Sequence, residues 1–260
     1  MASNHPFLLL FFFFFFSILS FPSLNAAVSQ RLIQLPTARP LTDDNYLYCD
    51  SWRLSVETNN AGAWSSIPDV CVSFVADYVT GDRYLSDSAV VASDSLIFAN
   101  NVSLAGDGMD AWVFDIDETL LSNVPYYEVT GFSSDFNETS FDIWVESASA
   151  PALPASLNLY NELKELGFTL FLLTGRDEYA RNATVKDLLA AGYSDWKELI
   201  LRGDSDTGKT ATLYKSEKRA ELIEEGYRIH GSSGDQWSDL LGFAVAERSF
   251  KLPNPMYYIA

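Results

Sequence analysis

From residue 111 to about residue 234, short apolar runs alternate with amphipathic segments of helical length. The apolar runs cover residues 111–114, 168–173, 198–201 and 227–230. This alternation is typical of parallel strands whose crossover helices cover both faces of one sheet. The sequence therefore predicts an α/β fold, a Rossmann-like parallel sheet flanked by helices.

Helices are predicted where apolar residues recur at three- and four-residue steps. Between the apolar runs, we expect helices over residues 157–166, 177–189 and 216–225, each ended by a nearby glycine. The region from residue 43 to about residue 104 is also predicted to be mainly helical, and it carries no obvious chemistry.

The first 26 residues contain no Asp, Glu, Lys or Arg and include six consecutive phenylalanines at 11–16. This composition is typical of a secretory signal peptide. A membrane anchor is the alternative, but polar residues and a proline interrupt the apolar run before it reaches the ~20 residues that span a bilayer. We predict a signal peptide over residues 1–26, no stable membrane anchor after its removal, and a single domain over residues 27–260.

The secretory route changes how other features are interpreted. Glycosylation sequons begin at Asn101, Asn137 and Asn182, and an oxidising lumen allows Cys49 and Cys71 to form a disulfide. Two buried free thiols are the alternative, because the sequence does not show how closely the two cysteines approach each other.

Charge and composition exclude several classes of function. Thirty-five acidic against seventeen basic residues give a formal net charge of −18, which repels a phosphate backbone, so no nucleic acid partner is expected. With only two histidines and two cysteines in the chain, zinc sites and Cys/His nucleophile pairs are improbable. His230 has no evident base or metal partner, and we expect it to be structural.

Polar clusters follow the predicted strands, at residues 115–119, 174–176, 215 and 235–239. Because ligands of open α/β sheets bind beyond the carboxyl ends of the strands, we expect these clusters to meet there. Asp115 and Asp117 are spaced so that the first can attack a substrate while the second transfers a proton.

An acidic cluster alone is more often a solvated turn or a helix cap. Here Asp235 and Asp239 bring two more carboxylates to the same crevice. Such crowding raises the pKa of each carboxyl group and opposes folding unless a cation intervenes. The cofactor that this pattern predicts is a hard cation with oxygen ligands, Mg²⁺.

The clusters resemble, in order, the four motifs of the haloacid-dehalogenase-like (HAD-like) hydrolases: Asp115-Ile116-Asp117-Glu118-Thr119, Thr174 after Phe171-Leu172-Leu173, Lys215, and Gly234-Asp235 with Asp239. Other segments look like the plant class B-type acid phosphatases and vegetative storage proteins: Asn45-Tyr46 with Cys49-Asp50-Ser51-Trp52-Arg53, residues 172–176, and Lys251-Leu252-Pro253-Asn254-Pro255. The resemblance covers about residues 41–259 and implies a HAD-like fold with a small cap or loop insertion.

The resemblance also implies a role for each motif residue. Asp115 is the nucleophile that forms an aspartyl-phosphate, and Asp117 protonates the leaving oxygen and later activates water. Thr174 hydrogen-bonds the phosphoryl group, and Lys215 neutralises the nucleophile and the transferring oxygens.

By the same resemblance, Mg²⁺ is held by the Asp115 carboxylate, the Asp117 backbone carbonyl and Asp235, with Asp239 acting through water or through the other ligands. Asp117 favours phosphomonoester hydrolysis, because an alkoxide leaving group needs a proton. Phosphotransfer to an alcohol acceptor uses the same residues and stays open. We expect crowding by Asp239 and partial burial to raise the pKa of Asp117, and the cation and Lys215 to lower that of Asp115.

Substrate identity is less visible in the sequence. Arg176 is expected to contact phosphate or to brace its loop. Aromatic residues between the first two motifs can stack on an aromatic or sugar leaving group, although packing is their commoner role. These residues are Tyr126, Tyr127, Phe141 and Trp144.

The leading hypothesis is a Mg²⁺-dependent acid phosphatase that hydrolyses small-molecule phosphomonoesters in the vacuole or the cell wall. The alternative is a vegetative storage protein with little or incidental phosphatase activity, and the retention of Asp115 favours the enzyme. The sequence leaves open whether the protein is a monomer, a homodimer or a heterodimer.

Overall fold

The computed structural model describes residues 44–132 and 136–260; the predicted signal peptide lies outside the described residues. A parallel sheet with strand order β3-β2-β1-β4-β5 forms the centre of the fold. Its strands are β1 (Asp110–Phe114), β2 (Thr169–Asp177), β3 (Glu198–Arg202), β4 (Arg228–Gly234) and β5 (Arg248–Lys251). This arrangement confirms the predicted α/β class.

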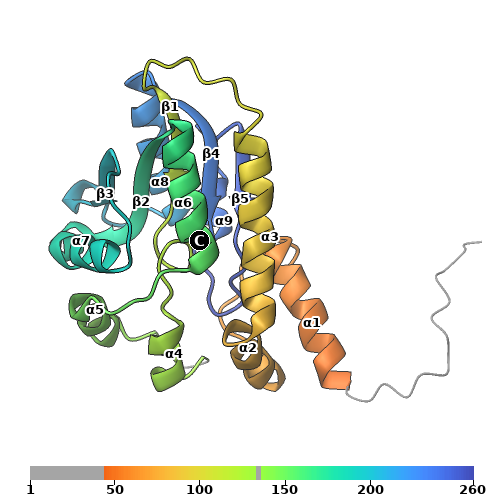
Figure 1. Cartoon of the computed structure of the whole chain (residues 1–260). Coiled ribbons are helices and arrows are strands. Elements are labelled where there is room, and N and C mark those ends of the chain that lie inside the picture. The colour runs from red at the N-terminus through yellow and green to blue at the C-terminus, as the bar shows by residue number, and fades with distance from the viewer. Residues whose placement is uncertain (1–43, 133–135) are drawn as a thin grey trace, which may run out of the picture. The chain divides into compact units, whose positions relative to one another are not determined.

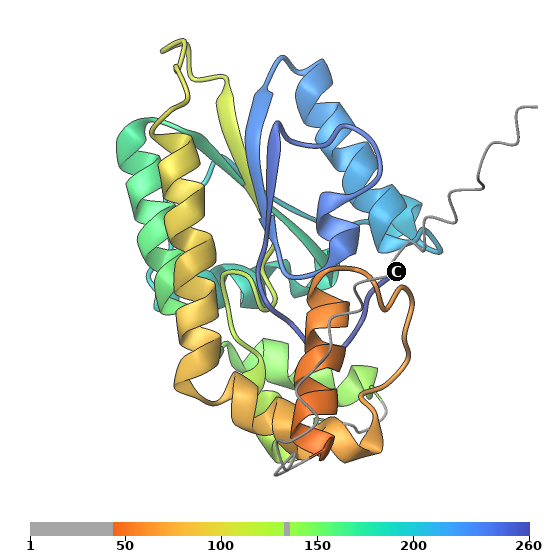
Figure 2. The ribbon, with the colours of Figure 1, turned by 90° about the vertical axis from the view of Figure 1, so that its right-hand side faces the viewer.

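Helices cover both faces of the sheet. The helices α3 (Asp82–Ala99) and α6 (Pro154–Leu166) lie side by side on one face, while α8 (Ala211–Glu224) and α9 (Trp237–Leu240) lie on the other (Figure 1, Figure 2). Strand β1 is buried on both faces, which explains its unbroken apolar sequence after Asp110.

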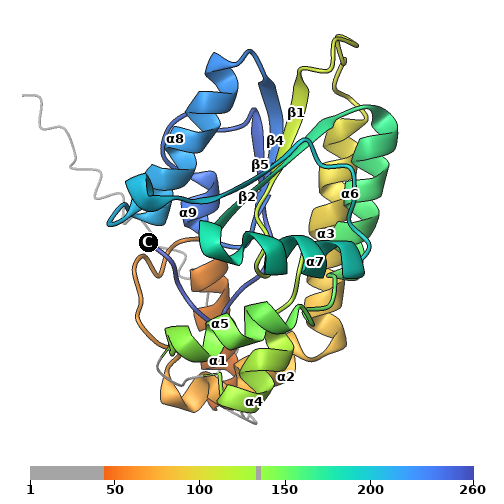
Figure 3. The same ribbon diagram turned by 90° about the vertical axis from the view of Figure 1, so that its left-hand side faces the viewer.

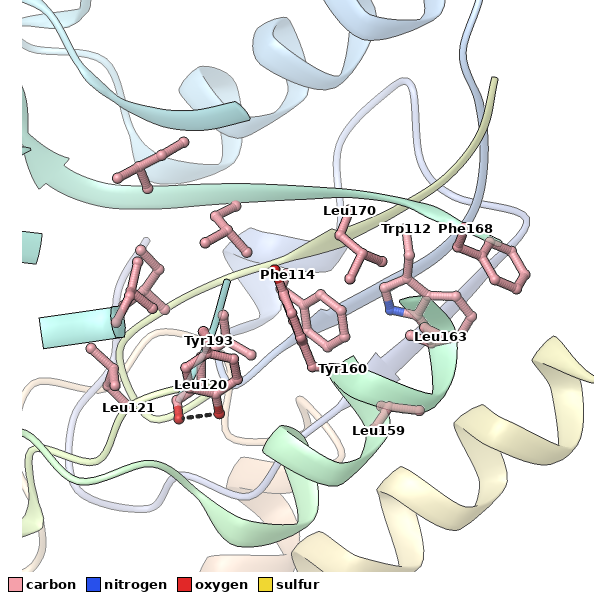
Figure 4. Packing of buried hydrophobic residues seen from close by; sticks show 14 of the residues in the cluster. Trp112, Phe114, Leu120, Leu121, Leu159, Tyr160, Leu163, Phe168, Leu170 and Tyr193 are labelled. Carbon is pink, nitrogen blue, oxygen red and sulfur yellow. Dashed lines mark hydrogen bonds between the residues drawn. The ribbon is translucent and has the colours of Figure 1, made fainter. Parts of the chain in front are cut away.

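Alternate side chains of β1 point to opposite faces and build two separate cores. Trp112 and Phe114 pack with α6, as Figure 4 shows, whereas Ala111 and Val113 pack on the side of α8. In the same view, the hydroxyl of Tyr193 donates to the carbonyl oxygen of Leu120 at 2.7 Å. That bond ties the segment after β1 to the core beneath it.

The expected helical region before β1 consists of α1 (Asp44–Glu57), the 3-10 turn η1 (Asp69–Cys71), α2 (Val72–Val79) and α3. The expected cap is a short insertion between β1 and α6, formed by α4 (Val124–Thr130) and α5 (Glu138–Ser147). Both helices lie beyond the carboxyl ends of the strands, with α7 (Arg181–Ala190) between α5 and the sheet (Figure 3).

Two predicted helix starts are wrong. Strand β2 continues to Asp177, which pairs with Arg202, so α7 follows only after the 3-10 turn η2 (Glu178–Ala180). Helix α8 begins five residues before residue 216, because the Thr210 side chain accepts the backbone N–H of Leu213 at 3.2 Å and caps the helix there. This earlier start places Lys215 inside α8.

No helix within residues 44–132 and 136–260 has both the length and the apolar character needed to cross a membrane.

The disulfide between Cys49 and Cys71 is confirmed. Their Cα atoms lie 5.3 Å apart, and both cysteines are buried, so the bond joins α1 to η1 inside an apolar cluster. The two residues are 22 positions apart in the sequence.

We predict that replacing both cysteines with serine lowers the free energy of unfolding by about 3 kcal/mol, since the open chain regains loop entropy. Chemical denaturation of the oxidised wild type and the double variant at one pH measures the difference. A change below about 0.5 kcal/mol would show that the crosslink contributes nothing to stability.

Candidate active site

The four polar clusters meet beyond the carboxyl ends of the strands, around one cavity of about 550 Å³. The cavity is lined by the sheet ends, by the insertion that contains α4 and α5, and by the C-terminal segment. Of the predicted site residues, these line it: Asp115, Asp117, Lys215, Asp235 and Asp239.

Asp115 follows β1 directly, and its backbone N–H donates to the carbonyl oxygen of Ser233 at 2.9 Å, which fixes it beside the end of β4. Its buried carboxylate accepts a hydrogen bond from the ammonium group of Lys215, which also donates to Asp239. Lys215 therefore bridges two buried carboxylates at the base of the cavity.

Helix α8 carries three basic side chains, Lys215, Lys218 and Arg219, and each has a different role in the structure. Lys215 alone reaches the cavity, whereas Lys218 pairs with Glu221 on the same helix. Arg219 is buried and donates to the carbonyl oxygens of Asp239 at 2.6 Å and Leu241 at 2.7 Å. Arg219 thus holds the segment that carries Asp239.

The Asp117 side chain bonds to Arg176 and Asn123, and no hydrogen bond joins it to Lys215 among the described residues. Arg176 donates to its carboxylate from Nη2 at 2.7 Å and from Nε at 3.1 Å, and Nδ2 of Asn123 donates at 2.8 Å. The residue after it, Glu118, has a φ of 53°, in the left-handed region, so the chain turns sharply at this point.

The pKa direction expected for Asp117 is wrong, whereas the direction expected for Asp115 depends on a bound cation as well as on Lys215. Burial raises the pKa of Asp115 well above its ordinary value, and the attraction of Lys215 only partly offsets it. Burial also acts on Asp117, but the charge and hydrogen bonds of Arg176 outweigh it and lower the pKa of Asp117. The prediction failed because it gave Asp117 a carboxylate neighbour rather than a guanidinium.

Three buried carboxylates form a group that can hold a cation. Asp115, Asp235 and Asp239 each offer an oxygen, and these oxygens all lie within 4.8 Å of one another. Burial and the nearby charges of Asp239 and Glu118 raise the pKa of Asp235 to about 7. An all-oxygen donor set with such crowding fits a hard divalent cation.

Neighbouring groups position Asp235. Its Oδ2 accepts from the side-chain amides of Gln236 and Asn254, both at 2.7 Å. Thr119 donates to its Oδ1 at 3.4 Å. The carboxylate of Asp117 does not belong to this group.

Thr174 lies within β2 and is fully buried. Its hydroxyl oxygen accepts the backbone N–H of Arg176 at 3.1 Å. Gly175 and Arg176 line the cavity, whereas Thr174 is not among its lining residues and instead holds the backbone of Arg176 within β2.

The aromatic residues noted in the sequence divide into two groups. Tyr126, Tyr127 and Phe141 line the cavity. Trp144 instead donates from Nε1 to Oδ1 of Asn123 at 2.8 Å. It therefore links α5 to the amide that holds Asp117.

Sequence reasoning missed Asn123 and the structural role of Glu118. Glu118 is fully buried and accepts the backbone N–H of Asn123 and the hydroxyl of Tyr257; burial and the charge of Asp117 raise its pKa to about 8. The acidic motif itself contained the signal, because a glutamate inside a buried turn needs partners.

His230 lies at the opposite end of the sheet from the cavity. Its Nε2 lies 2.8 Å from Oδ1 of Asp110, and its Nδ1 lies 3.0 Å from Oε2 of Glu247. It bridges Asp110, the first residue of β1, and Glu247, which directly precedes β5, so it links three neighbouring strands.

Comparisons with known proteins show the family of this chain. A family model described as HAD superfamily, subfamily IIIB (acid phosphatase), matches residues 35–260. Acid phosphatase 1 of Solanum lycopersicum is 51% identical over 240 residues, which cover 91% of this chain and 93% of that protein.

A second relative is vegetative storage protein 2 of Arabidopsis thaliana, 38% identical over 83% of this chain and 82% of its own length. Among solved structures, the class C acid phosphatase from Bacillus anthracis matches with a TM-score of 0.58. At 22% identity, over 72% of this chain and 84% of that chain, this match supports the fold alone.

Proposed function

The chain belongs to subfamily IIIB of the HAD superfamily, the acid phosphatases, and we propose that it hydrolyses small phosphomonoesters through an aspartyl-phosphate on Asp115. The observation that carries this proposal is the buried contact between Asp115 and Lys215 at the base of the cavity, beside the cluster of Asp235 and Asp239.

In the first step, an Oδ atom of Asp115 attacks phosphorus while the bond from phosphorus to the leaving oxygen breaks. Arg176 lowers the pKa of Asp117 in the free chain, and the negative charge of the bound phosphoryl group is expected to raise it, so that Asp117 is protonated in the complex. Asp117 then gives its proton to the leaving oxygen and becomes a carboxylate. Lys215 stabilises the negative charge on the transferring oxygens. The products of this step are the free alcohol and the aspartyl-phosphate.

In the second step, the Asp117 carboxylate accepts a proton from water as the water oxygen attacks phosphorus. The bond between phosphorus and Asp115 breaks, inorganic phosphate forms, and the Asp115 carboxylate is restored. Arg176 and Asn123 hold Asp117 in place for both steps through the bonds described above.

We propose that Mg²⁺ binds to Asp115, to the backbone carbonyl of Asp117 and to Asp235, with Asp239 supporting these ligands. When bound, the ion supplies positive charge that offsets the crowded carboxylates and the phosphoryl oxygens. The three-carboxylate group described above supports this assignment, and Lys215 supplies the remaining positive charge from the chain itself.

The aromatic lining of the cavity supports a leaving group with a flat face. Tyr126, Tyr127 and Phe141 come from α4 and α5, so the insertion forms a wall against which a ring or sugar can stack. Transfer of the phosphoryl group to an alcohol instead of water uses the same residues.

Replacing Asp117 with Asn is predicted to affect substrates according to their leaving groups. Loss of the general acid should lower kcat/KM for alkyl phosphates by about 10²-fold or more, because their leaving oxygens need a proton. For 4-nitrophenyl phosphate, whose leaving group departs without a proton, kcat/KM should fall much less. Initial-rate kinetics on both substrates give the comparison.

Asp142→Asn is the matched control, since it removes another cavity carboxylate that bonds to Tyr179 instead of Arg176. This variant should change kcat/KM by the same factor for the alkyl phosphate and for 4-nitrophenyl phosphate. Equal losses on the two substrates in the Asp117 variant would refute its role as general acid.

We also propose that residues 27–260 form the mature chain and enter the secretory pathway, to the vacuole or the cell wall. The disulfide supports this route, and so does the exposure of the three sequon asparagines. A storage role is the second candidate, favoured by the similarity to vegetative storage protein 2. The catalytic geometry around Asp115 supports turnover as the primary role.

The test is an assay of the purified mature chain on a panel of phosphomonoesters with Mg²⁺. We expect release of phosphate that saturates with substrate concentration and is faster on the acid side of neutrality. Rates no higher than those of buffer on every ester would leave storage as the function.

A further inference from the structure

Three cationic side chains line the cavity, and two of them are already neutralised. Arg176 forms an ion pair with Asp117, and Lys215 forms ion pairs with Asp115 and Asp239. Within residues 44–132 and 136–260, Arg202 has no carboxylate at ion-pair distance.

The guanidinium of Arg202 is held in place without being neutralised. It lies over the ring of Tyr214, 4.5 Å from the ring centroid, and that ring is fully buried. Its Nη1 donates to the carbonyl oxygens of Lys209 at 3.2 Å and Asp206 at 3.4 Å. Stacking on an aromatic face leaves the edge of the guanidinium plane available for hydrogen bonds.

The remaining donors of this group are unused. Nε and Nη2 of Arg202 donate to no acceptor in the part of the chain that the structure describes. A guanidinium edge with two adjacent donors matches the two oxygens of a carboxylate or a phosphate. The partner that this chemistry selects is an anion.

The position of Arg202 relative to Asp115 sets the size of the ligand. Arg202 ends β3, and β2 separates β3 from β1, which Asp115 follows. Neighbouring strands are about 4.8 Å apart, so the backbones of β1 and β3 are roughly 10 Å apart across the sheet, and the register places Arg202 further along the strand direction than Asp115. That distance fits a phosphoryl group at one end and a second anion at the other, joined by a ring or sugar.

We propose that Arg202 binds a second anionic group, a carboxylate or a phosphate, on the leaving group of the substrate. This inference rests on the proposed function, because Asp115 and Lys215 must receive the phosphoryl group that is cleaved. The preferred substrates are then phosphomonoesters whose leaving group is itself an anion.

One acidic neighbour, Asp177, lowers the positive potential at Arg202. Asp177 lies opposite Arg202 in the register of β2 and β3, lines the same cavity and is exposed. Its carboxylate forms no ion pair among the described residues, so it weakens the field at Arg202 without neutralising it. Removing its charge should strengthen the binding of an anionic leaving group.

The test measures binding, so it does not depend on turnover. Isothermal titration with Mg²⁺ present compares 4-carboxyphenylphosphonate with 4-carbamoylphenylphosphonate, which have nearly the same shape and differ in charge. A third ligand, benzene-1,4-diphosphonate, has a second phosphonate in place of the carboxylate. It shows which anion Arg202 prefers.

Arg202→Met should raise the Kd of the carboxylate or the bis-phosphonate ligand by about 10-fold, the value of a charged hydrogen bond. It should leave the Kd of the carbamoyl ligand within about 2-fold. Arg202→Lys should restore part of the loss, and Asp177→Asn should lower the Kd of the anionic ligands. Equal changes for charged and uncharged ligands in Arg202→Met would overturn the proposal.

The uncharged carbamoyl ligand also distinguishes a failure of this proposal from a failure of the proposed phosphatase function. If the wild type binds none of the three ligands, the phosphate site around Asp115 and Lys215 is refuted, and Arg202 with it. If the wild type binds all three ligands, and each Kd is the same in the wild type and in Arg202→Met, only the proposed role of Arg202 is refuted.

Discussion

Replacing Asp115 with Asn should lower kcat by about 10³-fold or more on every phosphomonoester, while the protein stays folded. The amide has nearly the shape of the carboxylate but cannot attack phosphorus. The effect should be independent of the leaving group, because the nucleophile is needed for good and poor leaving groups alike. Steady-state kinetics with circular dichroism on the same samples measures both activity and fold.

The control variant is Asp110→Asn, which removes a buried carboxylate from the other end of the same strand. Asp110 pairs with Arg228 and His230 there and does not line the cavity. This variant should lose stability but keep the kcat of its folded fraction. Substantial turnover in Asp115→Asn would refute covalent catalysis through this residue.

Removing divalent cations should abolish turnover, and adding Mg²⁺ should restore it. Asp115, Asp235 and Asp239 crowd three buried carboxylates together, and Lys215 offsets only part of their charge. Without a cation, the protonated forms of Asp115 and Asp235 gain population, and the nucleophile is lost. Dialysis against chelator followed by titration of Mg²⁺ measures the loss and the recovery.

Asp235→Asn gives a second measure of the same site, independent of activity. It should raise the Kd for Mg²⁺ by at least about 10-fold, since even supporting partners of metal ligands have effects of that size. Calorimetric titration of the metal against wild type provides the value. Asp206→Asn, at a buried aspartate that pairs with Lys209 and does not line the cavity, should leave the Kd for Mg²⁺ unchanged. Full activity in excess chelator would exclude the ion from the reaction.

The sequence was most informative where residues sit at strand ends. Asp115 and Asp235 were placed correctly beside each other because each follows an apolar run, and parallel strands end at one edge of the sheet. Strand β5 was missed because it has four residues and only Phe250 among them is apolar. A strand so short has no period to detect.

The sequence alone could not predict which charged side chains pair with each other inside the site. The sequence did not show which of Asp115 and Asp117 pairs with Arg176, because the pairing depends on the backbone turn at Glu118, beside Asp117. Among the three basic residues of α8, the resemblance selected Lys215, which lines the cavity, but the apolar pattern of the helix alone does not show which of them does so. Their roles depend on which side of the helix faces the cavity, and the helix begins five residues earlier than its apolar pattern indicates.

The most direct test of the proposed chemistry is to trap the covalent intermediate. The mature chain with Mg²⁺ is mixed with a fast aryl phosphate and quenched in acid within the first turnover, and its peptides are analysed by mass spectrometry. The account predicts one phosphoryl group on Asp115, stable in acid and lost in alkali, and none in Asp115→Asn. A phosphoryl group on another residue, or none while phosphate is released in a burst, would contradict it.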